Sequence, residues 1–67
     1  MLGPLEIERI RNEISERGES TVSAKELRRF YDDATATEQW GHIAKLAIDE
    51  HWAFTFFPDG AIRFARL

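Results

Sequence analysis

Cysteine is absent from this chain of 67 residues. Without thiols the protein can form neither a disulfide bond nor a thiolate metal site, and we expect a reducing compartment, the cytoplasm. The only two histidines, His42 and His51, are nine residues apart and fall on nearly opposite sides of a helix. Because an ordinary zinc site needs three or four convergent ligands, the sequence predicts no metal centre. We expect His51, beside Trp52, to be a packing residue at a helix end.

Long apolar runs are also absent, and the stretch from Met1 to Glu6 carries no basic residue. We therefore expect neither a secretory signal nor a membrane span. The chain has no glycine-rich phosphate loop and no serine in a glycine-flanked elbow. A core of this size leaves little volume for a substrate pocket. We therefore expect no enzymatic activity, no cofactor and no small-molecule substrate.

Positively charged residues are in the minority. The chain has nine Lys and Arg and twelve Asp and Glu, which gives a net charge of −3. Phosphate attraction dominates affinity for DNA, so a nucleic acid would have to be met by a local basic patch. The chain is 43% hydrophobic and 31% charged, which is typical of a folded domain. We expect one domain over 1–67, of low stability, since so short a chain buries only about 60% of its unfolded surface.

Apolar spacing predicts a first helix that begins with Pro4 and ends at Gly18, with Ile7, Ile10 and Ile14 on one face. Residues 19–22 are β-prone and predict one or two residues of strand. A capping box from Ser23 to Glu26 begins a second helix, which we expect to run to about Asp32.

A third helix is predicted after a break at residues 33–37, with Thr35 or Thr37 as its cap, and it runs to about Glu50. Its broad apolar face is expected to include five residues: Trp40, Ile43, Ala44, Ala47 and Ile48, with Leu46 at the edge. The opposite side is polar and carries Glu38, His42, Lys45 and Asp49.

Alternating aromatic residues over 52–57 and apolar residues over 61–67 predict a β-hairpin with Pro58-Asp59-Gly60 as its loop. If Phe57 faces Ala61, Phe56 faces Ile62 and Phe54 faces Phe64, so these last four side chains share one face while Thr55 and Arg63 pair on the other. A slip of one residue would put Arg63 beside Phe56, which the burial pattern disfavours. The fold class is therefore α+β.

This order of elements resembles the winged helix-turn-helix family over nearly the whole chain. The residues that carry the resemblance are Thr21-Val22 before the capped Ser23 to Leu27, the helix from Trp40 to Ile48, and the hairpin from Phe54 to Phe64. The resemblance implies that the third helix enters the major groove of DNA and that the hairpin is the wing. A regulatory role, with the protein acting as a dimer, follows from the same resemblance.

Under that interpretation Gln39 and His42 would read base edges, and Thr37 would contact a phosphate. Lys45 would be a further DNA-binding residue of the third helix. Further phosphate contacts would come from the densest basic group and the returning strand, which supply Lys25, Arg28, Arg29 and Arg63. Alternatively, Arg28 and Arg29 pair with the acidic residues four positions on, Asp32 and Asp33, as on an ordinary solvated surface.

A second hypothesis uses the same fold as a protein-interaction or dimerisation module without DNA binding. It rests on the acidic net charge, on the mixed third helix, and on Phe57, which is predicted to point away from the core and to mark a partner surface. A third hypothesis is a structural domain within a larger assembly.

Overall fold

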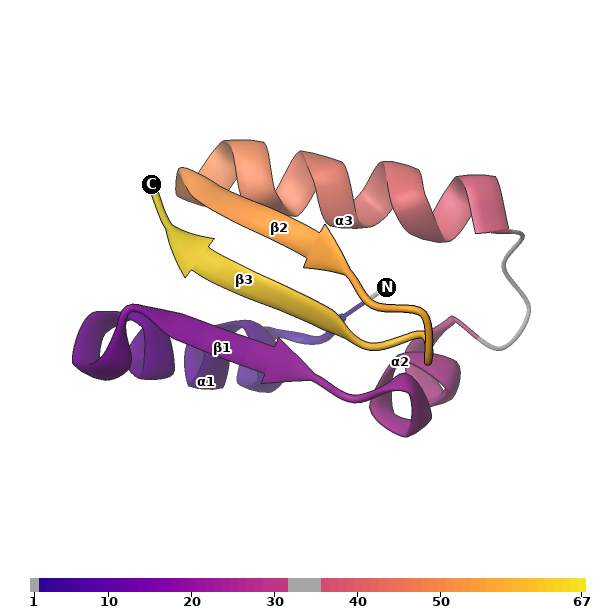
Figure 1. The fold of residues 1–67 in the computed structure, drawn as a ribbon, viewed down its shortest axis with the longest axis horizontal. Coiled ribbons are helices and arrows are strands. Elements are labelled where there is room, and N and C mark those ends of the chain that lie inside the picture. Colours follow the sequence, from indigo (N-terminus) through magenta and orange to yellow (C-terminus); the bar gives the residue numbers. More distant parts are fainter. Residues whose placement is uncertain (1, 32–35) are drawn as a thin grey trace.

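The computed structural model describes residues 2–31 and 36–67. Six elements follow one another in these residues: α1 (Pro4–Arg17), β1 (Glu19–Val22), α2 (Ala24–Phe30), α3 (Ala36–Glu50), β2 (Trp52–Phe56) and β3 (Ile62–Arg66). The strands form an antiparallel sheet in the order β1-β3-β2, so β3 is central (Figure 1). This confirms the α+β prediction and the order of elements. β1 is longer than expected and pairs over four residues with β3.

The first helix has the ends that its sequence predicts. Pro4 occupies its first turn, where a missing N–H costs nothing. Gly18 ends it in the left-handed conformation, at a φ of 84°, and donates its N–H to the carbonyl of Ile14 at 2.8 Å. Ile10 and Ile14 are buried and Ile7 packs partly against them, so the predicted apolar face is confirmed.

The second helix forms half of the predicted capping box. Ser23 Oγ accepts the N–H of Glu26 at 3.2 Å, but the Glu26 carboxylate pairs with Arg9 of α1 at 3.0 Å. The helix ends at Phe30, before the expected Asp32, because Tyr31 leaves the helical region with a φ of −126°. Asp32, Asp33 and Thr35 lie outside the described residues.

The hairpin has the predicted register, with Phe54 opposite Phe64, Thr55 opposite Arg63 and Phe56 opposite Ile62. The N–H of Phe57 donates to the carbonyl of Ala61 at 2.9 Å, which closes the three-residue loop. Within that loop Gly60 has a φ of 94°, and a Cβ placed there would lie 3.2 Å from the Cβ of Ala24. The tip of the hairpin therefore lies against the start of α2.

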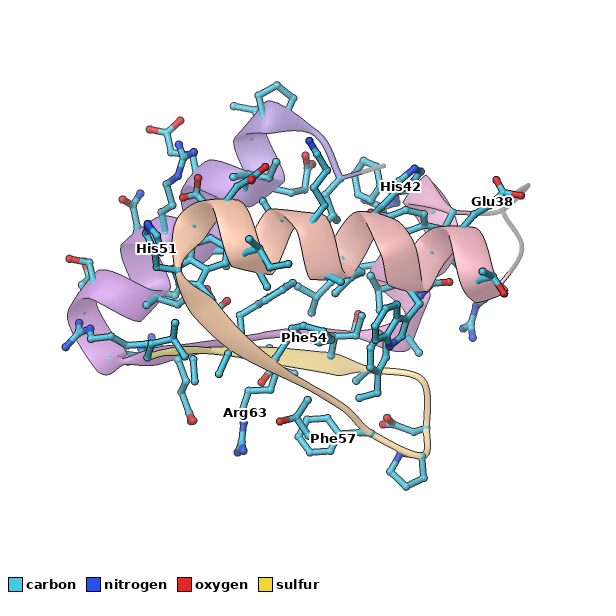
Figure 2. The ribbon with its side chains drawn as sticks, turned by 90° about the horizontal axis from the view of Figure 1, so that it is seen from above. Glu38, His42, His51, Phe54, Phe57 and Arg63 are labelled. Atoms are coloured by element: carbon cyan, nitrogen blue, oxygen red, sulfur yellow. The ribbon has the colours of Figure 1, made fainter. Side chains whose placement is uncertain are left out.

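The core lies between the helices and one face of the sheet. Its largest fully buried side chains come from every helix and from β1 and β3: Phe64, Ile10, Leu27, Ile43, Ile62 and Val22. Thr55 and Arg63 lie on the other face of the sheet, where Figure 2 shows Arg63 and Phe57 on the side away from α1 and α3. No helix in the described part of the chain is long and apolar enough to cross a membrane.

The prediction of a broad core-facing side on α3 is wrong, because the buried side is narrower than expected. Ile43 and Ala47 are buried, but Trp40 is 55% exposed and Ile48 is 71% exposed. The reason is the position of α3 beside β2, the edge strand of the sheet (Figure 1). Since residues 2–31 and 36–67 form no further strand beyond β2, one flank of the helix is left without a strand to pack against. His51 is also exposed, in a turn with a φ of 61°, and is not the packing residue that the sequence predicts.

Candidate interaction surface

The four residues of α3 predicted to contact DNA do not share one face. At about 100° per residue, Thr37 and Gln39 lie roughly 160° apart around the helix. Thr37 lies inside the helix and not at its cap, and it is exposed, whereas Gln39 is half-buried. His42 is exposed and its ring lies 5.9 Å from that of Tyr31, at the end of α2. Lys45 is exposed and pairs with Asp49 at 3.9 Å.

A shallow pocket lies on the flank of α3 that carries His42. It has a volume of about 150 Å³ and is mostly apolar, with Leu2, Ile7, Tyr31 and Leu46 in its wall and His42, Lys45 and Asp49 at its rim. The hydroxyl of Tyr31 accepts the N–H of Leu2 there at 3.3 Å, and burial raises the pKa of this phenol. The pocket is smaller than the several hundred Å³ of a typical ligand site.

The basic residues of α2 form a separate group. Lys25, Arg28 and Arg29 are exposed within about 100° of one another around the helix. None of them pairs with a carboxylate within residues 2–31 and 36–67. They lie on a different element from Lys45 and Arg63, each of which has an acidic neighbour.

Arg63 and Phe57 lie together on the open face of the sheet. The guanidinium carbon of Arg63 is 5.6 Å from the centre of the Phe57 ring, and a guanidinium nitrogen is 3.9 Å from Glu19. The prediction that Phe57 points away from the core agrees with its place in Figure 2, and the ring is half-buried under Arg63. Phe57 is therefore less available to a partner than the sequence suggests.

Apolar side chains gather instead on the other side of the hairpin, along the flank of α3. The ring of Trp40 meets that of Phe54 edge-on at 6.0 Å, and Phe54 meets Phe56 edge-on at 5.7 Å. Ile48 lies two helical turns beyond Trp40 and is 71% exposed. We name these four residues, Trp40, Ile48, Phe54 and Phe56, the aromatic patch. The sequence contains all of them, but periodicity assigned them to the core.

Two arginines that the sequence interpretation left aside hold the elements together. Arg11 of α1 donates from Nε and Nη2 to the two carboxylate oxygens of Glu50 at the end of α3, at 2.5 and 2.8 Å. Arg66 of β3 donates from Nη2 to the carbonyls of Ile14 and Ser15, at 2.8 and 3.1 Å. No local spacing could have revealed either contact, because the partners are 39 and more than 50 residues apart.

The hydrogen bonds from Arg11 hold the pKa of Glu50 below its ordinary value. A carboxylate whose pKa falls on folding adds stability above its unfolded pKa, and this stability is lost as the pH falls through the folded value. Glu50→Gln should therefore be less stable than the parent chain at pH 7, and the gap should close as the pH falls below about 4. Urea unfolding at pH 7, 5 and 3 measures it.

The matched control for that comparison is Glu16→Gln, because Glu16 is exposed on α1 and makes no ion pair with another described residue. The difference in stability between Glu16→Gln and the parent chain should be small at every pH. A Glu50→Gln gap that stays constant from pH 7 to 3 would show that the ion pair with Arg11 contributes nothing to stability in solution.

Comparison with known proteins found no match to this chain among family models, curated proteins or solved structures.

Proposed function

We propose that this chain is a winged-helix domain whose function is to bind protein through the aromatic patch. The proposal of a winged helix is supported by the order of the elements and by the strand order β1-β3-β2, in which the last two strands form a hairpin. On such a fold, the function depends on the surface that the third helix and the hairpin present together.

The observation that carries the proposal is the exposure of large apolar side chains on that surface. Trp40 and Ile48 expose more than half of their surface, and Phe56 exposes 38% of its own. Contacts between the rings of Trp40, Phe54 and Phe56 hold three of the four side chains in one cluster. Trp and other aromatic residues are enriched at the centres of protein interfaces, where charged residues are depleted.

DNA fits the same surface less well, because it needs cations there. The α3 positions around the patch, namely Thr37, Gly41 and Ala44, are uncharged. On the same helix Lys45 and Asp49 form an ion pair and their charges cancel, and Arg63 on the sheet has Glu19 beside it. A helix in the major groove would meet phosphates without a net positive charge to hold them.

Phosphate contact remains the second candidate function, on the strength of one observation. Lys25, Arg28 and Arg29 are exposed together on α2 and have no acidic partner within the described ranges. These three cations are the local basic patch that an acidic chain needs for nucleic acid. Titration with duplex DNA at low and moderate salt separates this candidate from protein binding, because only the former weakens steeply with salt.

Photo-crosslinking in cells that express the chain tests the proposed function. Gly41 is the position of choice for a photoreactive phenylalanine analogue, because it is exposed beside Trp40 and an added Cβ would meet nothing within 4 Å. The analogue at Glu16, on α1, is the matched control. We expect protein adducts from position 41 alone, identified by mass spectrometry, and their loss when Trp40→Ser is added. Equal adducts from both positions, or none, contradict the proposal.

A further inference from the structure

We infer that the partner of the aromatic patch is a second copy of this chain, with the two α3 helices packed antiparallel across a twofold axis near Ala44. The inference rests on the proposed function and names its partner. In an interface of this kind both copies use the same surface patch, so that patch must be complementary to itself.

The exposed flank of α3 has this self-complementary pattern. Trp40, Ala44 and Ile48 follow one another at intervals of four residues, so a large side chain stands on each side of a small one. About an axis at Ala44, Trp40 of one copy meets Ile48 of the other. Ala44 and the exposed Gly41 leave room for the two helix backbones to come close. The rings of Phe54 and Phe56 then lie beside the helix pair as further apolar contact.

Two copies of the chain carry the same net charge, so they can meet only where charged side chains are absent. Each chain carries a net charge of −3, and two copies would repel if the contact were made by charged surfaces. The aromatic patch and three α3 positions on the same flank, Thr37, Gly41 and Ala44, carry no charged side chain. Lys45 and Asp49, which lie next to this flank, neutralise each other within one copy. The uncharged flank is therefore the part of α3 where two copies can approach without repulsion.

The area of the patch fits a weak homodimer. An aromatic side chain offers about 150–250 Å². With the same range for Ile48, the exposed fractions of 55%, 71% and 38% at Trp40, Ile48 and Phe56 leave roughly 250–400 Å² of apolar surface per copy. Homodimer interfaces are about 65% apolar, which corresponds to a total of roughly 400–600 Å² per copy. Two copies would then bury about 800–1,200 Å², a range around the lower limit of a specific interface.

Sedimentation equilibrium of the purified full chain tests the inference over about 5–500 µM, the range that suits a micromolar dissociation constant. We expect the apparent mass to rise with concentration from 7.8 kDa towards twice that value. Ile48→Lys should raise the dissociation constant at least tenfold. Leu5→Lys is the matched control, because Leu5 is an equally exposed apolar residue, at 78%, on α1. Leu5→Lys should dimerise with the dissociation constant of the parent chain.

Crosslinking tests the position of the twofold axis. Since the chain has no cysteine, Ala44→Cys introduces a single thiol at the proposed axis, and Asn12→Cys introduces one on the exposed side of α1. A short bis-maleimide should join two Ala44→Cys chains and leave Asn12→Cys chains unjoined. Equal crosslinking of both variants, or none of either, contradicts the antiparallel packing of α3.

The two proposals fail in different ways. A chain that stays monomeric at every concentration overturns the inference of a second copy. If the Gly41 photo-crosslinker then yields adducts with a different protein, the proposed function stands and only the partner is wrong. If it yields no adducts above the Glu16 control, both proposals are wrong. If Leu5→Lys loses the dimer as well as Ile48→Lys, the interface is not confined to the aromatic patch and the inference is wrong.

Discussion

Phe64→Ala is expected to destabilise the domain by about 3–5 kcal/mol. Phe64 has no exposed surface, lies on the central strand and packs its ring 5.4 Å from that of Trp52. Truncation removes the apolar surface that the ring buries and leaves a cavity that the surrounding sheet and helices cannot fill. At about 0.05–0.15 kcal/mol per residue, a chain of this length has only about 3–10 kcal/mol in total. Much of the variant should therefore be unfolded at 25 °C.

Urea unfolding followed by tryptophan fluorescence measures the loss, since Trp52 is beside the substituted ring. Phe57→Ala is the control, because it removes a ring of the same size from the same hairpin, where it contacts Arg63 on the open face of the sheet. That substitution should cost below about 1 kcal/mol. A Phe64→Ala chain that unfolds with the midpoint of Phe57→Ala would show that the core does not depend on this ring.

Arg66→Ala is expected to cost about 1–2 kcal/mol, although the side chain is exposed. The last four carbonyls of a helix have no partner within the helix, and Arg66 Nη2 donates to two carbonyls of the final turns of α1, those of Ile14 and Ser15. The backbone N–H of Arg66 also donates to the carbonyl of Gly18 at 2.9 Å. The side chain therefore joins the end of the first helix to the last strand.

Two variants separate this role from charge alone. Arg66→Lys keeps the positive charge near the helix C-terminus but not the planar fork, so it should recover part of the lost stability. Arg63→Ala removes a neighbouring arginine that makes a 3.9 Å ion pair with Glu19 and lies over the Phe57 ring, and it should cost below about 1 kcal/mol. Urea midpoints compare the three. Equal losses at 63 and 66 would contradict a specific contact at the helix end.

The hairpin was predictable because its information is local. Pro58-Asp59-Gly60 specifies a loop, and only one register places Phe54, Phe56, Ile62 and Phe64 on the same face. The helix ends at Gly18 and Ser23 were predictable for the same reason, since a left-handed glycine and a capping serine act within a few residues. The hydrogen bonds of Arg11 and Arg66 were not, because their partners are brought near only by the complete fold.

The surface of α3 shows where local pattern misleads. Periodicity finds which side of a helix is apolar, but not how much of that side the rest of the molecule covers. Ile43, Ala47, Trp40 and Ile48 look alike in the sequence, and only the first two are buried. What separates them is the position of β2 at the edge of the sheet, which is a property of strand order. The candidate interaction surface therefore became visible only with the structure.

The central place of β3 has a consequence for how the chain folds during synthesis. β1 has no strand to pair with until residues 62–66 exist, so its ladder joins Glu19 to Ala65 and Val22 to Ile62 across most of the chain. The sheet against which α1 packs is completed only when β3, the last of the six elements, has been made. A nascent chain without that segment exposes the apolar faces of α1 and β1 together. The sheet of this domain is therefore assembled only after translation has passed its final strand.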